Sequence, residues 1–195
     1  MIDGGKYVLD RSRFHSQENN GIELLVPGLE YCGPTADTNC VASLLDEYVL
    51  PVGGWPDPQP EDIQTLAYIS PGNWPEFNKI RPLNFDKIPP NRVPQYTPYA
   101  VMLLYPQLDV QFMWFNEIGK NAWEYMIENI KTSTFKICEP GHYVCIHGYD
   151  TDQKVLLKKD SWISRFSDRD GFNKPFTYDT FRVCEPFLIE FRRKI

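Results

Sequence analysis

The chain has 195 residues, of which 42% are hydrophobic and 14% aromatic, and its formal net charge is −6. These values exclude a disordered or fibrous chain, and the length favours a single domain spanning residues 1–195. Lys and Arg are scattered except in the final FRRKI, so we expect no nucleic-acid partner.

No apolar stretch has the length of a signal peptide core or a membrane span. We therefore expect a soluble protein, cytoplasmic as synthesised, whose site of action stays open because release by lysis or transport in a virion would leave the same sequence. The five cysteines are an odd number without the spacing of a disulfide framework, which favours free thiols. They are Cys32, Cys40, Cys138, Cys145 and Cys184.

The first predicted element is an amphipathic helix that begins near Pro34, within YCGPTADTNCVASLLDEYV. Its apolar face repeats at helical spacing through Ala36, Cys40, Val41, Leu44, Leu45 and Tyr48. Cys32 is expected just before the first turn, where unpaired N–H groups and the helix dipole favour a thiolate. Cys40 falls on the apolar face and is expected in the core.

The middle of the chain is a proline-rich insertion at about 51–106, which holds twelve of the seventeen prolines. These prolines interrupt short helical stretches such as 60–68 and 97–105. Trp55 and Trp74 lie in its loops, where stacking on a ligand and simple packing are equally good interpretations. The segment is expected to pack as loops on the body of the domain.

The last third predicts a strand at 108–115, a helix at 122–132, and strands at 135–138, 142–150, 154–160 and 181–191. A helix followed by an antiparallel sheet defines an α+β fold. Trp114 and Trp123 lie within these elements and are expected to pack in the core.

The strands at 142–150 and 154–160 read as a hairpin that brings His142 and Asp160 together. A loop of three or five residues pairs Tyr149 with Val155 and places Asp160 diagonally beside His142 on one face. A loop of two or four residues turns Asp160 away, and both registers stay open. His147 pairs with about residue 157 and is interpreted as structural or surface-exposed.

A metal site is not favoured by the same segment. Cys138, His142, Cys145 and His147 resemble a compressed zinc signature, but on a strand His142 points away from the face of Cys145 and His147. DRDG at 168–171 lacks the remainder of a calcium-binding loop and is interpreted as a turn. No metal is expected.

The ordered motifs YCGPTA, GHYVCIHGYD and KKDSW resemble the papain-like cysteine peptidase superfamily, closest to the bacteriocin-processing, double-glycine-leader branch. The resemblance covers about 16–40 and about 123–162, and it implies a papain-like fold that needs no cofactor. It implies Cys32 as nucleophile, His142 as general base and acid, and Asp160 as the group that orients the imidazole. Gln17 is the implied oxyanion-hole residue, although it lies fifteen residues before Cys32, a longer gap than the family usually has, and a solvent-facing loop glutamine is the alternative.

The resemblance implies hydrolysis of a peptide or isopeptide bond through an acyl-enzyme. Two alternatives stay open: a phage-type peptidoglycan-degrading endopeptidase or amidase with the same triad, and a non-catalytic papain-like binding or virion structural protein. The expected partner is thus a peptide or a peptidoglycan peptide, and the pattern contains no signal for an oligomeric state.

Overall fold

The computed structural model describes residues 6–8, 32–45, 101–102, 104–160 and 173–194. The elements in these residues are β1 (Lys6–Val8), α1 (Cys32–Leu44), β2 (Leu108–Trp114), the short 3₁₀ helix η4 (Phe115–Glu117), α5 (Ala122–Asn129), β3 (Ser133–Glu139), β4 (His142–Asp150), β5 (Val155–Lys159), β6 (Lys174–Phe176), α6 (Tyr178–Phe181) and β7 (Phe187–Arg193). Val101, Met102 and Leu104 are helical, as expected for the end of the proline-rich segment. The remainder of that segment, with Trp55 and Trp74, lies outside the described residues.

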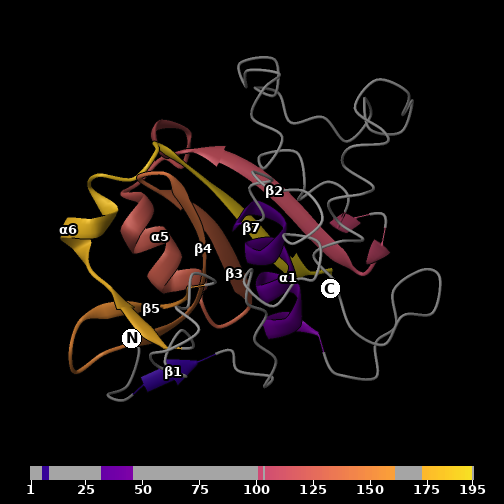
Figure 1. The fold of residues 1–195 in the computed structure, drawn as a ribbon, viewed down its shortest axis with the longest axis horizontal. Coiled ribbons are helices and arrows are strands. Elements are labelled where there is room, and N and C mark those ends of the chain that lie inside the picture. The colour runs from indigo at the N-terminus through magenta and orange to yellow at the C-terminus, as the bar shows by residue number, and fades with distance from the viewer. Residues whose placement is uncertain (1–5, 9–31, 46–100, 103, 161–172, 195) are drawn as a thin grey trace, which may run out of the picture.

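The described strands form one antiparallel seven-stranded sheet in the order β2-β7-β3-β4-β5-β6, with β1 paired to β4 (Figure 1). β3 pairs with the first half of β4, from Phe135↔Ile146 to Glu139↔His142. β1 pairs with the last three residues of β4, Gly148 to Asp150, so it continues along β4 beyond the end of β3. The α+β class is therefore confirmed in the described part of the chain.

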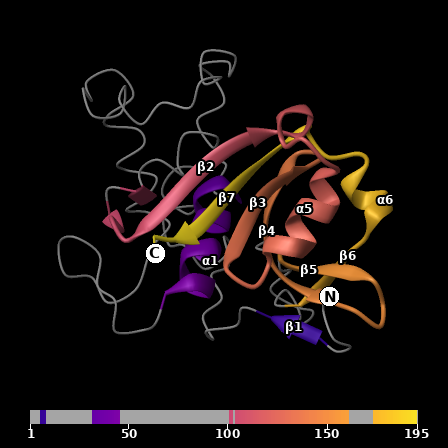
Figure 2. The same cartoon turned by 180° about the vertical axis from the view of Figure 1, so that it is seen from behind.

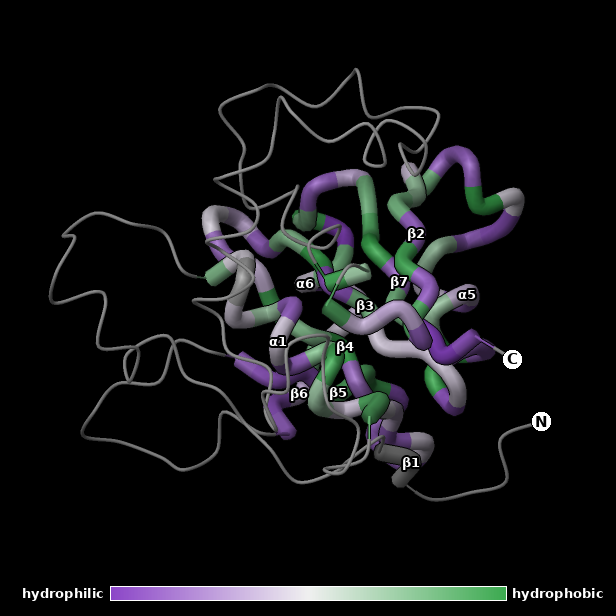
Figure 3. The backbone as a smooth tube through the Cα atoms, turned by 90° about the vertical axis from the view of Figure 1, so that its right-hand side faces the viewer, coloured by the Kyte–Doolittle hydropathy of each residue, from purple (hydrophilic) through white to green (hydrophobic). Residues whose placement is uncertain are grey.

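Helices α1 and α5 cover opposite faces of this sheet (Figures 1 and 2). Side chains alternate along β4, so Tyr143 and Cys145 join the core beneath α1 whereas Val144 and Ile146 join the core beneath α5. Figure 3 shows hydrophobic stretches in the central strands β4 and β7. A sheet covered on both faces keeps its central strands buried, and β4 is buried from His142 to Gly148.

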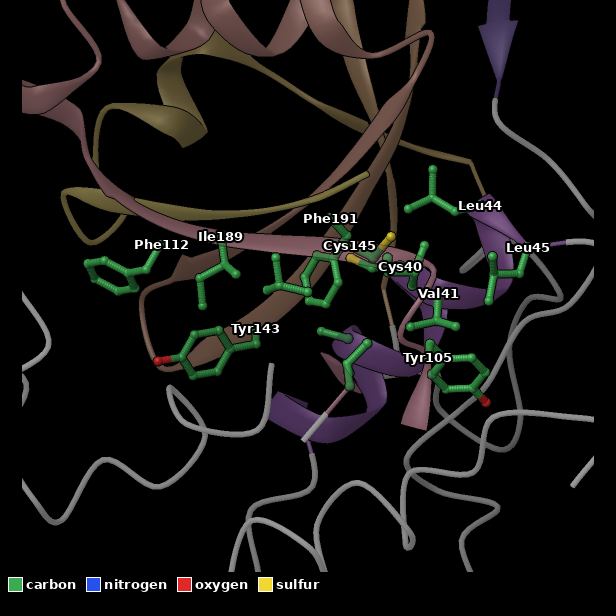
Figure 4. Close-up of a cluster of buried hydrophobic side chains, with 14 of the residues drawn as sticks. Cys40, Val41, Leu44, Leu45, Tyr105, Phe112, Tyr143, Cys145, Ile189 and Phe191 are labelled. Carbon is green, nitrogen blue, oxygen red and sulfur yellow. The ribbon is translucent and has the colours of Figure 1, made fainter. Parts of the chain in front are cut away.

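The core beneath α1 contains the predicted apolar face of the helix as far as Leu45, whereas Tyr48 lies outside the described residues. Ala36, Cys40, Val41 and Leu44 pack against the sheet there, and Figure 4 shows Cys40 and Val41 beside Cys145 and Phe191. Every side chain described on α1 is buried, however, including its polar residues. The amphipathic pattern therefore predicted the apolar face but not the burial of the polar side chains.

The predicted strand at 181–191 is wrong in its first half. Phe181 is the last residue of α6, whose N-cap Thr177 accepts a hydrogen bond from the backbone N–H of Thr180. A turn follows, and β7 begins at Phe187, immediately after Pro186, which has no N–H to donate to a neighbouring strand. The side-chain cap outweighs the β-branched and aromatic composition at this point.

The packing expected for Trp114 and Trp123 is confirmed. Trp123, a residue of α5, is buried in the core between α5 and the sheet, where its ring stacks on Phe176 with centroids 6.0 Å apart. Trp114 is partly buried against the other core, in edge-to-face contact with Phe112 at 5.3 Å.

Candidate active site

Cys32 is the first residue of α1, and its exposed fraction is only 8%. The helix therefore begins two residues earlier than the predicted start near Pro34. A proline as third helical residue is tolerated because the first four N–H groups of a helix have no acceptor within it. Cys32 still belongs to this N-terminal turn, where the unpaired backbone N–H groups carry the positive end of the helix dipole.

A tight hairpin sets the position of His142. Glu139 and His142 are cross-strand partners at the ends of β3 and β4, so Pro140 and Gly141 alone form the connection. Gly141 has φ +75°, and this pattern of proline followed by a left-handed glycine is that of a type II turn. The turn places His142 at the first position of β4, at the end of the sheet.

The pairing of β4 with β5 that brings Asp160 to His142 differs from both registers predicted from the sequence. The loop between β4 and β5 has four residues, since Asp150 pairs with Val155, and Tyr149 pairs with Leu156 rather than with Val155. A four-residue loop alone turns Asp160 away, but a β-bulge between Ile146 and Gly148 shifts the pairing by one residue. Continued by one residue, the pairing of Cys145 with Lys159 brings Asp160 across from Val144, on the face of His142.

The bulge contains His147, which is completely buried. It lies opposite residues 157 and 158, as expected from its predicted pairing with about residue 157, and its burial excludes the surface position and leaves the structural interpretation. The extra residue changes which side chains of β4 share a face with β5. His147 therefore lies at the irregularity that brings the candidate acid to the candidate base.

The His142 ring interacts with the other two predicted residues, Asp160 and Cys32. Its Nε2 lies 3.0 Å from Oδ1 of Asp160, and the two side chains are 10% and 14% exposed. Burial by itself lowers the pKa of His142, but hydrogen bonds with Asp160 and Cys32, and the negative charges of both partners, raise it to about 9. An imidazole with this pKa is protonated at neutral pH.

Asp160 is also surrounded by lysines that the sequence analysis did not single out. Nζ of Lys158 lies 3.4 Å from Oδ2 of Asp160 and 2.6 Å from Oε1 of Glu139, and Nζ of Lys174 lies 3.7 Å from the same Oδ2. Lys158 is detectable in the sequence, because it is two residues before Asp160 and shares its face of β5. Lys174 belongs to β6, a strand that the sequence pattern did not predict.

Burial raises the pKa of three other described cysteines. Cys138, in β3, has an exposed fraction of 8%, and burial raises its pKa to about 11. Cys40 is completely buried, as predicted, and burial together with a hydrogen bond to Cys145 raises its pKa well above the usual value. Burial raises the pKa of Cys184 to about 12. Three of the five thiols are thus held in the neutral form.

Several other predicted features fall outside the described residues or lack a ligand geometry. Gln17, Trp162 and the DRDG turn at 168–171 lie outside the described residues. Within the described ranges, no three His, Cys, Asp or Glu side chains are arranged to hold a metal ion. This statement covers the four residues of the compressed zinc signature. Among the helices described here, none combines the length and apolar character needed to cross a membrane.

Comparison with models of known protein families gives no match for this chain, and comparison with curated proteins gives none either. The function is therefore inferred from the arrangement of Cys32, His142 and Asp160 and from the resemblance of the three motifs to papain-like peptidases.

Proposed function

We propose that this protein is a papain-like cysteine peptidase that hydrolyses a peptide or isopeptide bond through an acyl-enzyme. The observation that carries the proposal is the position of the His142 ring, whose Nε2 lies 3.0 Å from Oδ1 of Asp160 and whose pKa is raised both by Asp160 and by the thiol at the N-terminus of α1. A nucleophile, a base in contact with it and a third group that orients the base are the parts that nucleophilic catalysis needs.

In the resting enzyme, the protonated His142 holds Cys32 as a thiolate, and the N-terminus of α1 favours the same charge. The Cys32 sulfur attacks the carbonyl carbon of the scissile bond and forms a tetrahedral intermediate. His142 donates its proton to the leaving amine, which departs and leaves a thioester on Cys32.

A water molecule then donates a proton to His142 and attacks the thioester carbonyl, which releases the acid product and regenerates the pair. Asp160 keeps the ring in one orientation and stabilises its positive charge throughout. The backbone N–H of Cys32 is the candidate donor to the oxyanion, with Gln17 as its predicted companion. A donor of this kind contributes about 3 to 4 kcal/mol of transition-state stabilisation.

The three residues do not select the acyl group, so the peptide of a protein and the stem peptide of peptidoglycan are both compatible substrates. The peptidoglycan-degrading enzyme is the alternative with the same mechanism. A non-catalytic binding or virion protein is the alternative that predicts an ordinary thiol at Cys32. The reactivity of this thiol therefore decides between catalysis and binding before any substrate is known.

The structure offers an internal control for this measurement, because Cys32 and Cys138 are equally exposed. At pH 6 to 7 we expect iodoacetamide to modify Cys32 at least about tenfold faster than Cys138, since the thiolate is the reacting species. Modified sites are identified by peptide mass. In His142→Gln the advantage of Cys32 should disappear, while the rate at Cys138 should stay unchanged.

Activity is then measured on a mixture of quenched fluorescent peptides and on purified peptidoglycan, with Cys32→Ser as the inactive control. Cleavage of either substrate by the wild type alone supports the peptidase and identifies the substrate class. Equal, slow modification of Cys32 and Cys138 at every pH would overturn the proposal and favour the binding protein.

A further inference from the structure

Asp160 has two carboxylate oxygens with different partners. Oδ1 lies 3.0 Å from Nε2 of His142, whereas Oδ2 lies 3.4 Å from Nζ of Lys158 and 3.7 Å from Nζ of Lys174. Asp160 directly follows β5, so the regular pairing of the sheet ends one residue before it. The orientation of its carboxylate therefore depends on side-chain contacts to both oxygens.

Lys158 is held more firmly than Lys174. Its Nζ lies 2.6 Å from Oε1 of Glu139, and the side chains of Lys158 and Glu139 are 12% and 13% exposed. Lys174 is 38% exposed. A partly buried ammonium with two carboxylate partners keeps its position better than an exposed one, because long surface side chains lose rotamer freedom on pairing and are screened by water.

Glu139 is in turn the cross-strand partner of His142. The side-chain contacts therefore run from His142 to Asp160, from Asp160 to Lys158 and from Lys158 to Glu139, and the backbone pairing of Glu139 with His142 in the β3–β4 hairpin connects the two ends of this series. Each member of such a series restricts the rotation of the next one.

We propose that Lys158 is a positioning residue of the site, which holds Oδ2 of Asp160 so that Oδ1 faces Nε2 of His142. This inference rests on the proposed function for its importance in catalysis, but the geometry can be tested without a substrate. The ion pairs of Lys158 are with Asp160 and Glu139, so it acts on His142 through Asp160. A network of this kind commonly orients the residues that carry out the chemistry.

Two possible roles of Lys158 predict opposite changes in the pKa of His142. If Lys158 were only a nearby positive charge, its removal would raise the pKa, because a like charge disfavours the imidazolium. If Lys158 positions Asp160, its removal lets the carboxylate turn away and weakens the bond to Nε2. The pKa of His142 then falls, since the hydrogen bond and the charge of Asp160 both raise it and burial opposes them.

The experiment is an NMR titration of the His142 ring in the full chain, which contains three histidines. The signal is assigned by its absence in His142→Gln. Among the described residues, Asp160 and Cys32 on α1 act on the charge of the ring, and Lys158 on β5, Lys174 on β6 and Glu139 on β3 are linked to it through Asp160. All variants keep Cys32, Glu139 and Asp160 unchanged.

In Lys158→Met we expect the pKa of His142 to fall by about one pH unit or more, which is the usual effect of losing a contact with a carboxylate. Lys174→Met is the matched control, which removes the same charge from the same oxygen, and it should raise the pKa slightly or leave it unchanged. Lys158→Arg should restore the wild-type value, because a guanidinium can contact both carboxylates. Lys158→Gln provides a second test if the methionine variant does not fold, with a smaller fall expected.

A rise in the pKa of His142 in Lys158→Met, or equal changes in Lys158→Met and Lys174→Met, would overturn the positioning role. An unchanged pKa would also overturn it and leave Lys158 with a purely structural role. Failure of the proposed function looks different, because Cys32 would then be as unreactive as Cys138 in the wild type, whatever the titration of His142 shows.

Discussion

Replacing Lys136 by methionine tests how the helix that carries Cys32 is held against the sheet. Nζ of Lys136, on β3, lies 2.9 Å from Oδ2 of Asp37, on α1, and both side chains are completely buried. The ammonium also lies 4.8 Å from the centre of the Tyr143 ring. Methionine has a similar length but no charge, so it removes the ion pair with little change in volume.

The loss of free energy of unfolding in Lys136→Met can be estimated in two ways. Removing one partner of a buried ion pair costs about 3 to 5 kcal/mol, because the other charge keeps its desolvation penalty. In the variant the Asp37 carboxyl can avoid a larger penalty by taking up a proton on folding, which at pH 7 costs about 4 kcal/mol for an ordinary aspartate carboxyl. We therefore expect Lys136→Met to lower the free energy of unfolding by about 4 kcal/mol at pH 7.

Proton uptake makes this loss depend on pH. The folded variant would bind a proton that the unfolded chain releases, so its stability falls as pH rises. Relative to the wild type, the loss should grow by about 1.4 kcal/mol for each pH unit between pH 5 and 7. Lowering the pH should thus partly rescue the variant.

The assay is equilibrium urea unfolding at pH 5 and pH 7 for the wild type, Lys136→Met, Asp37→Leu and the double variant. The double variant should recover most of the stability, because hydrophobic replacement of a buried ion pair is often neutral or stabilising. The reasoning is refuted if Lys136→Met loses less than about 1 kcal/mol at pH 7, or if the double variant loses the sum of the two single losses.

Two further predictions concern the turn and the ring of His142. Gly141→Ala should lower the free energy of unfolding by about 1 to 2 kcal/mol, measured in urea, because alanine is strained at φ +75° although the space around this position is open; an unchanged stability would contradict the turn geometry. The His142 ring should lose its proton as pH rises through about 9, and Cys32→Ser should lower this pKa because the negative charge of the sulfur is removed. If His142 has the same pKa in the wild type and in Cys32→Ser, Cys32 does not act on the ring and the prediction is wrong.

The α+β class of the fold and the choice of His142 and Asp160 as partners were predictable from the sequence. Helical spacing predicted the apolar face of α1 correctly, and alternation of side chains located most of the strands, because both patterns depend on local geometry. Cys32, His142 and Asp160 were selected by motif and order along the chain. In the structure Nε2 of His142 lies 3.0 Å from Oδ1 of Asp160, and the thiol of Cys32 contributes to the raised pKa of the same ring.

The tertiary structure alone decided how Asp160 reaches His142. From the loop length alone, four residues predict that Asp160 points away, and only the bulge at His147 reverses that result. A bulge depends on how a strand is packed on both faces, which no local pattern records.

The charges around the site were also decided by packing. Lys158 finds Glu139 only because β5 and β3 lie on either side of β4, and Lys136 finds Asp37 only because α1 packs on β3. These partners are 19 and 99 residues apart in the chain. A buried charge needs a partner, but its identity follows from the arrangement of the elements in space and not from the spacing of residues along the chain.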